Sequence, residues 1–253
     1  MSRFLYLTQR VSVVIWISVI ILIYLCIKIN LLMNDMKELS IAKVNFPEIT
    51  SAELVPGILD QCHIPFQEIA CVNWKDYPYQ PAVRFRAAHT GDAILLNYRI
   101  TEKSVRAVAS EDNGSVWEDA CAEFFIQLPG DKKENYYNFE CNCAGKLLIG
   151  YGKQGDRTHA GSEPLVGVKR WSSLGNQPFE ERMGECSWEL ALVIPASSFF
   201  AHQLKDFSHM EATGNFYKCG DKLETPHFLS WAPIDLPAPC FHCPDFFGKL
   251  HFE

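Results

Sequence analysis

The sequence lacks the patterns that mark several common protein classes. It shows no convincing amphipathic helix in the predicted domain described below, and over 253 residues it shows no internal repeat and no stretch biased enough to be disordered. A helical bundle, a repeat array and a largely disordered chain are therefore excluded. The sequence also contains no motif of a catalytic nucleophile, and acidic residues are missing from the first 32 positions.

Those first 32 positions differ from the rest of the chain. Residues 11–27, VSVVIWISVIILIYLCI, form an apolar run long enough to span a bilayer. Arg3 and Arg10 precede it and no small-residue cleavage site follows, which predicts an uncleaved anchor with an exported domain. A second interpretation stays open. Met33 begins a stretch that reads like a natural start, so residues 1–32 could be a wrongly translated leader of a cytoplasmic protein.

Outside this segment the chain carries a strongly negative net charge. Three of the 23 basic residues and none of the 30 acidic residues fall in residues 1–32, which leaves 20 basic against 30 acidic residues, a net charge of −10. Such a surface repels nucleic acid and anionic lipid headgroups. We expect no nucleic-acid partner, and we expect neutral or cationic ligands.

The ten cysteines do not form the pattern of a zinc site. CNC (141–143) and CFHC (240–243) suggest ligands, with His242 as a further one, but a four-thiolate zinc site usually has two CxxC-like pairs. Cys26 lies in the apolar run, so nine cysteines belong to the rest of the chain. An odd number is unusual for a fully disulfide-bonded protein. We interpret most of them as small buried thiols and expect no bound metal at these two pairs.

Short apolar or alternating runs recur from Pro81 onward, separated by turn residues, and predict an all-β antiparallel sandwich or barrel. They cover 83–87, 93–100, 104–108, 121–128, 136–143, 146–152, 165–170, 187–194, 215–220, 227–233 and 248–252. The predicted organisation is an N-terminal segment at 1–32, a lead-in arm at 33–64 and a sandwich domain at 65–253. We expect this domain to be monomeric and Trp231 to lie in its core.

The run YYNFECNC (136–143) predicts two faces, because side chains alternate along a strand. Tyr137, Phe139, Cys141 and Cys143 share the face expected to meet the core. The other face carries Asn138, Glu140 and Asn142, which suit hydroxyl groups, although a solvated outer face would look the same.

Four segments taken together resemble the family 9 carbohydrate-binding modules found beside xylanases. They are VWEDACAEFFI (116–126), YYNFECNCAGKLL (136–148), WELALVIP (188–195) and FLSWAPI…CPDFFGKLHF (228–252). The resemblance runs from about residue 65 to residue 252. It implies a β-sandwich of jelly-roll type that holds a sugar between two aromatic rings, with calcium bound nearby, and a non-catalytic role linked to polysaccharide catabolism.

The resemblance also implies a set of ligand residues. Trp117 and Phe241 correspond to the two rings, Glu123 and Asn142 to polar groups that contact the sugar, and Lys218 to a sugar-binding glutamine. Glu140, on the same strand as Asn142, is a further ligand residue. The chain departs from the family at three positions: Glu140 replaces an arginine, Phe241 replaces a tryptophan, and Lys218 replaces the glutamine. Aromatic planes bury the C–H faces of a pyranose while polar groups reach its hydroxyls.

Two other functions stay open. Glu123, Glu140 and Asp119 could serve as the paired carboxylates of a glycoside hydrolase, although nothing else in the sequence supports an enzyme. A related superfamily of sandwiches binds haem through Met and His, but only Met183 and Met210 lie in the predicted domain. Calcium is the remaining cofactor expectation, with Glu118 and Asp119 as possible oxygen ligands.

Overall fold

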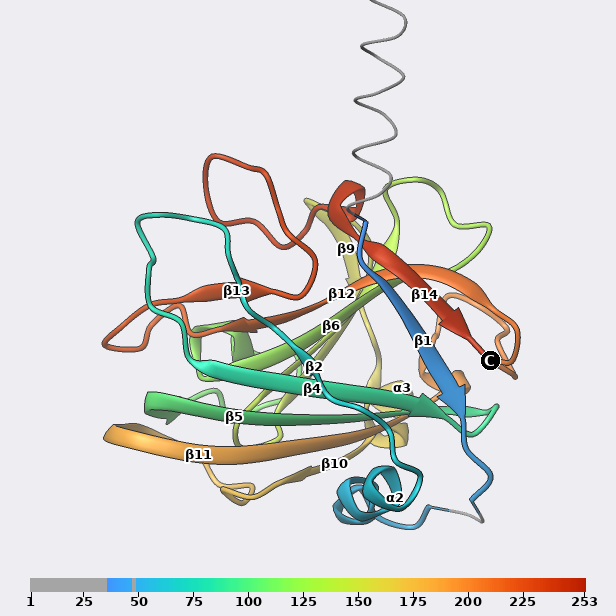
Figure 1. Cartoon of the computed structure of the whole chain (residues 1–253), viewed down its shortest axis with the longest axis horizontal. Coiled ribbons are helices and arrows are strands. Elements are labelled where there is room, and N and C mark those ends of the chain that lie inside the picture. The colour runs from blue at the N-terminus through green and yellow to red at the C-terminus, as the bar shows by residue number, and fades with distance from the viewer. Residues whose placement is uncertain (1–35, 47–48) are drawn as a thin grey trace, which may run out of the picture. The chain divides into compact units, whose positions relative to one another are not determined.

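Two β-sheets face each other in the computed structural model, which describes residues 36–46 and 49–253 (Figure 1). Sheet A runs in the order β14 (Gly248–Phe252), β12 (Glu211–Cys219), β6 (Cys121–Gln127), β7 (Tyr136–Asn142), β8 (Leu147–Lys153) and β9 (Asp156–His159). Sheet B runs in the order β10 (Lys169–Ser172), β11 (Phe179–Pro195), β5 (Ala93–Ala107) and β4 (Ala82–His89). The short strands β2 (Gln67–Glu68), β13 (Phe228–Ser230) and β3 (Cys71–Val72) pair with β4, β12 and β13. The predicted mostly-β sandwich is therefore confirmed, whereas its jelly-roll type stays a prediction.

One strand joins the two sheets. β1 (Glu38–Lys43) pairs in parallel with β14 on one side and with β4 on the other. This differs from the purely antiparallel sandwich that the sequence predicts. β1 also lies inside the range predicted to be a lead-in arm, but residues 37–253 form one compact unit.

Residues 52–61 of the predicted lead-in arm cover the outer face of sheet B. α2 (Val55–Gln61) follows η1 (Ala52–Leu54), and its buried residues Ile58 and Leu59 pack with Leu95 and Val193 of sheet B. The sequence conceals this helix because it is short and carries Pro56 in its first turn, where proline is tolerated.

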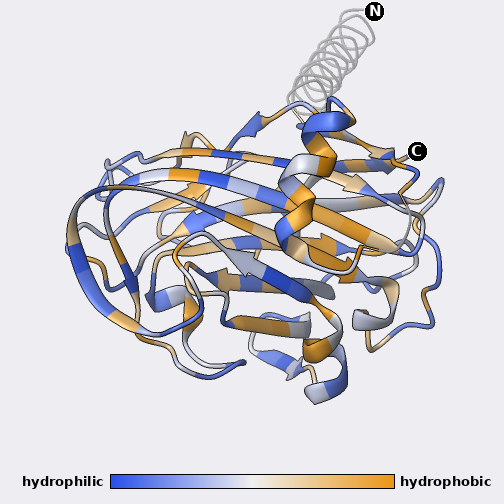
Figure 2. Cartoon of the chain, turned by 90° about the horizontal axis from the view of Figure 1, so that it is seen from below, coloured by the Kyte–Doolittle hydropathy of each residue, from blue (hydrophilic) through white to orange (hydrophobic). Residues whose placement is uncertain are grey.

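The main core lies between the sheets. In Figure 2 hydrophobic and hydrophilic residues alternate along many strands, as expected when one face is buried. The ring of Phe85 on β4 stacks on that of Phe216 on β12, with centroids 3.8 Å apart. Trp231, only 1% exposed, meets both rings edge-on, which confirms its predicted core position. A Cβ at position 248 would lie 2.5 Å from this indole, so Gly248 is required for β14 to pass it.

One predicted strand is wrong. Residues 165–170 begin inside the helix α3 (Ser162–Gly167), and strand β10 starts only at Lys169. Short apolar runs do not distinguish a strand from a buried helical turn. Only Leu165 of α3 is buried.

No helix within the described residues combines the length and apolar character needed to cross a bilayer. The anchor predicted at residues 11–27 lies outside the described residues, as does the alternative start at Met33.

Candidate functional site

A cavity of about 390 Å³ opens on the outer face of sheet A, on the side away from the main core. Its floor comes from β6, β7, β8 and the end of β12, and its walls come from η2 (Val116–Glu118) and the loop 239–242. The volume falls in the range of small-molecule sites. Sheet A therefore has a buried inner face and an outer face shaped to hold a ligand.

Alternation on β7 assigns side chains to these two faces. Tyr137, Phe139 and Cys141 belong to the core between the sheets, while Asn138 and Glu140 line the cavity. The two predicted faces of residues 136–143 are confirmed. The outer face is not solvated here, because Asn138 and Glu140 are only 2% and 4% exposed.

Trp117 forms one wall of the cavity. Val116 anchors η2 by packing with Cys121 and Leu148, and the Trp117 carbonyl accepts a hydrogen bond from the Asp221 amide at 3.3 Å. These contacts hold the indole at the cavity mouth, where it is 37% exposed. A tryptophan so exposed yet held by its backbone is available for a ligand to stack on.

Phe241 forms part of the other wall. Its ring stacks on Tyr217 of β12 at 4.2 Å with an interplanar angle of 9°, and the Tyr217 hydroxyl donates to the Phe241 carbonyl at 3.2 Å. One face of the half-buried Phe241 ring is thus covered, Trp74 and Phe228 pack beside it, and the ring also lines the cavity. Neither Phe241 nor Trp117 packs between the sheets.

Two carboxyl groups lie side by side on the floor. Glu123 of β6 is the direct cross-strand partner of Glu140 of β7, and both line the cavity while nearly fully buried. The Asn138 amide donates to Glu140 Oε1 at 2.7 Å, and Cys219 Sγ lies 2.9 Å from Glu123 Oε1.

Burial and mutual repulsion change the acidity of these groups. Burial raises the pKa of Glu123 well above its usual value, and the Glu140 charge raises it further. Burial likewise raises the pKa of Glu140 to about 7, and that of Asp221, at the cavity edge, to about 6. Near neutral pH the floor can therefore both donate and accept hydrogen bonds.

Arg157 of β9 was missed by the sequence reasoning. Its guanidinium donates to Gly152 O at 2.7 Å, Tyr136 O at 3.1 Å and Asn138 Oδ1, and it lies 4.4 Å from the centroid of the Tyr136 ring. It crosses β8 at Gly150, where a Cβ would lie 3.4 Å from Arg157 Nε and 2.6 Å from Asn138 Oδ1. The glycines in LLIGYGK were the signal, because a glycine within a strand often marks a close approach by another group.

Two predicted ligand residues lie away from the cavity. Asn142 braces the turn after β7: it donates to Asp119 Oδ2 at 2.9 Å and accepts from the Ala144 and Lys146 amides at 3.1 and 2.9 Å. These hydrogen bonds within the protein occupy the donor and acceptor atoms of the Asn142 side chain that a sugar would need.

Lys218 points between the sheets instead of into the cavity. On β12 the residues beside it, Tyr217 and Cys219, face outward, so Lys218 faces inward and is fully buried. Its ammonium lies 2.9 Å from Glu102 Oε2 and 2.8 Å from His227 Nε2. The structure therefore assigns Lys218 to a buried ion pair.

The residues predicted to hold calcium do not fit that role. The Asp119 carboxylate accepts from the amides of Val108 and Ala109 at 3.0 and 2.9 Å, and Glu118 pairs with Lys222 at 2.9 Å. Because these oxygens already bind donors within the protein, we derive no calcium site from them.

The two predicted cysteine pairs do not meet. Cys141 and Cys143 lie in the main core, whereas Cys240 and Cys243 lie on the outer loop with their sulfur atoms 3.1 Å apart. His242 contacts the Tyr136 hydroxyl at 2.8 Å, and burial lowers its pKa to about 4. A joint CNC–CFHC zinc site is thus ruled out by the position of the first pair.

The fold and the cavity together define a β-sandwich binding module, with an aromatic-walled and polar-floored pocket on one sheet. The chain belongs to carbohydrate-binding family 9, whose model matches residues 53–252. No protein with a curated function matches the chain.

Solved structures agree with this assignment. A candidate carbohydrate-binding protein from Bacteroides uniformis ATCC 8492 is 59% identical, with a TM-score of 0.84 over 86% of this chain and 100% of its own. Two structures of a family 9 module from Caldicellulosiruptor kristjanssonii, in complex with glucose and with cellotriose, are each 10% identical. Their TM-scores are 0.51 and 0.54 over 86% of this chain and 96% and 94% of theirs, so they show the shared fold.

Proposed function

We propose that the chain binds a saccharide without catalysis in the cavity on sheet A. The observation that carries this proposal is the convergence of Trp117 and Phe241 on a floor that contains Glu123, Glu140 and Arg157. The aromatic rings offer apolar surfaces to the C–H faces of a pyranose. The carboxyl and guanidinium groups offer hydrogen bonds to its hydroxyls, and charged partners make the stronger ones.

The complexes of the Caldicellulosiruptor kristjanssonii module support the ligand class, because they hold glucose and cellotriose. We infer a mono- or oligosaccharide, or the end of a polysaccharide chain, as the ligand. The family's association with polysaccharide breakdown suggests a role beside degrading enzymes such as xylanases. Arg157 is a sugar contact in this proposal. The family's arginine is replaced by Glu140 in this chain, and Arg157 brings a guanidinium from β9 to the same floor.

Trp117→Ala tests this proposal by isothermal titration calorimetry with glucose, cellotriose and xylo-oligosaccharides. Loss of the stacking surface should weaken binding at least about 30-fold, the level of an interface hot spot. Circular dichroism should stay unchanged because the indole is partly exposed. Met183→Ala on β11, where the side chain is 65% exposed, is the matched control and should bind as the parent does.

Equal saccharide affinity of the Trp117→Ala variant and the parent would refute the cavity as the binding site. Chromatography of the oligosaccharides after incubation checks the remaining enzymatic alternative, which rests on the paired Glu123 and Glu140. Release of shorter saccharides would replace binding with hydrolysis as the function.

We also propose that residues 11–27 anchor this module at a membrane with the sandwich exported. The support is the length of the apolar run and the arginines that precede it. Membrane fractionation of the full chain and of a chain lacking residues 1–32 tests this. Recovery of both in the same soluble fraction would contradict it.

A further inference from the structure

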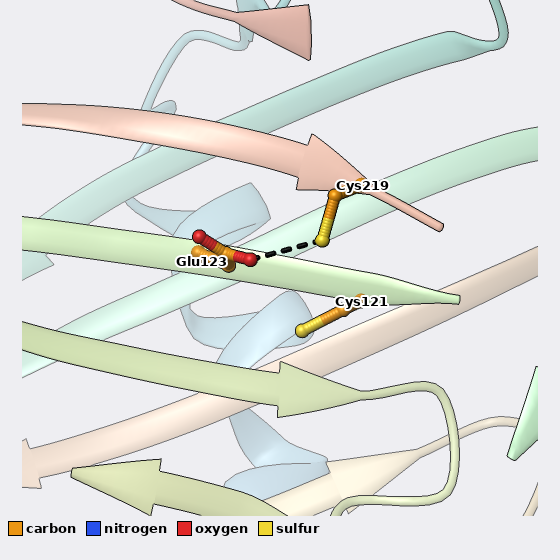
Figure 3. Close-up of side chains that lie close together, drawn as sticks. All are labelled: Cys121, Glu123 and Cys219. Carbon is orange, nitrogen blue, oxygen red and sulfur yellow. Dashed lines mark hydrogen bonds between the residues drawn. The ribbon is translucent and has the colours of Figure 1, made fainter. Parts of the chain in front are cut away.

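Two cysteines far apart in the sequence meet beneath the cavity. Cys121 begins β6 and Cys219 ends β12, and the strand register makes them direct cross-strand partners. Glu123 follows two residues after Cys121, so alternation puts its carboxylate on the same face. The two sulfur atoms and a carboxylate oxygen all lie within 4.8 Å of one another, and all three residues are buried (Figure 3).

This arrangement is held by the sheet. Both strands are central in sheet A, and the β6–β12 ladder continues from Cys121 and Cys219 to Thr213 and Gln127. The backbone positions of the three residues therefore cannot separate without breaking hydrogen bonds of the sheet. Such rigid positioning of ligand atoms is what a metal site on a sheet requires.

Few positive charges lie near these residues. Glu123, Glu140 and Asp221 lie together, and among the described residues that line the cavity Arg157 is the single arginine or lysine. Its guanidinium donates to Tyr136, Gly152 and Asn138 rather than to these carboxyls. Lys218, adjacent in sequence to Cys219, points to the other side of the sheet. A bound cation would offset this cluster of buried acids.

We propose that Cys121, Cys219 and Glu123 bind a thiophilic divalent cation of the Zn²⁺ type. Two sulfurs and one carboxylate oxygen are three of the four ligands of a tetrahedral zinc site. Glu123 and Cys219 line the cavity, so the fourth position is open to water or to a ligand hydroxyl. Binding releases the two thiol protons to solvent, together with the carboxyl proton of Glu123 where this group is protonated, as the cation takes their place.

Cobalt titration of the reduced, chelator-treated full chain tests the proposal. A tetrahedral site with two thiolates should give sulfur-to-cobalt charge-transfer absorption that saturates at about one ion per chain and is displaced by Zn²⁺. Cys121→Ser and Cys219→Ser should each lower metal affinity more than about 100-fold, since loss of an outer partner alone costs up to that much. Metal-free thermal melts of both variants confirm that they fold.

The CFHC loop provides the second arm of the experiment, because Cys240 and Cys243 are the other close pair of thiols. A Cys240→Ser, Cys243→Ser double variant should keep the cobalt spectrum, and Cys186→Ser on β11 should do so too. The proposal is overturned if the reduced parent shows no charge-transfer band. It is also overturned if the band survives Cys121→Ser and disappears in the Cys240→Ser, Cys243→Ser variant. A disulfide between Cys121 and Cys219 in the native protein would overturn it as well, because it would exclude the metal. Saccharide titrations of the chelator-treated chain are carried out without metal, so the two proposals can fail separately.

Discussion

Glu140 illustrates how burial on the cavity floor changes a single side chain. It lies directly across from Glu123, with the Asn138 amide as its hydrogen-bond donor. Burial has the largest effect and raises the pKa of Glu140 from 4.5 to about 7. Asn138 and Arg157 each lower this pKa, but by less than burial raises it. A carboxyl with these properties favours a polar ligand that can share its proton.

Glu140→Gln should change how the free energy of unfolding depends on pH. With its raised pKa, folded Glu140 keeps a proton that the unfolded chain releases, so the parent loses stability as pH rises from about 4.5 to about 7. Removing this term should make the variant more stable than the parent at pH 8 by up to about 3 kcal/mol, and nearly equal at pH 5. Urea unfolding of both chelator-treated chains at the two pH values measures this. Parallel pH profiles would show that Glu140 titrates normally.

A buried ion pair connects strand β12 of sheet A to strand β5 of sheet B. Lys218 of β12 and Glu102 of β5 are both fully buried at the side chain, and His227 lies 3.4 Å from the same carboxylate oxygen. Burial raises the pKa of Glu102, but Lys218 and His227 together outweigh it and hold the pKa below its usual value. The pair therefore links sheet A to sheet B and leaves the cavity to other residues.

Lys218→Met should destabilise the fold by about 3–5 kcal/mol, because it leaves Glu102 buried without its main partner. The folded fraction should still bind saccharide with the parent's affinity, since Lys218 does not reach the cavity. Adding Glu102→Gln should recover much of the loss. Denaturant unfolding combined with calorimetry distinguishes this from a ligand role, in which affinity would fall while stability stayed the same.

β1 closes the sandwich as a whole. It lies between β14 and β4, with Ile41 fully buried, and the backbone carbonyl of Ile41 accepts a hydrogen bond from the Glu253 amide at 3.1 Å. Figure 1 shows β1 and β14 side by side near the C-terminus. Without β1, β14 and β4 would each lose a paired neighbour, and exposed strand edges promote aggregation.

A chain that begins at Val44 should therefore lose at least about 3 kcal/mol of stability through the buried Ile41 and the broken ladders. A chain that begins at Lys37 is the control and should melt as the full chain does, because residues 37–253 form one compact unit. Thermal melts with light scattering would measure both effects. Equal melting of the two truncated chains would show that β1 contributes little.

Local patterns in the sequence determined most of the strands from residue 82 onward, the two faces of β7 and the core position of Trp231. They succeeded because successive side chains of a strand point to opposite faces, so Tyr137 and Glu140, three positions apart, must lie on different faces. The resemblance to the family also led to Trp117, Glu123, Glu140 and Phe241, which the structure brings around one cavity. Whether they bind sugar stays a prediction.

Tertiary structure alone decided which face of β12 meets the core, that Asn142 braces a turn, and that Arg157 reaches across β8. It also paired Cys121 with Cys219 and placed β1 between two strands in parallel. Most of these depend on register between segments that are far apart in the sequence, where a shift by one position exchanges the inner and outer faces. No local pattern contains that register, because it is set by how the sheets pack on each other.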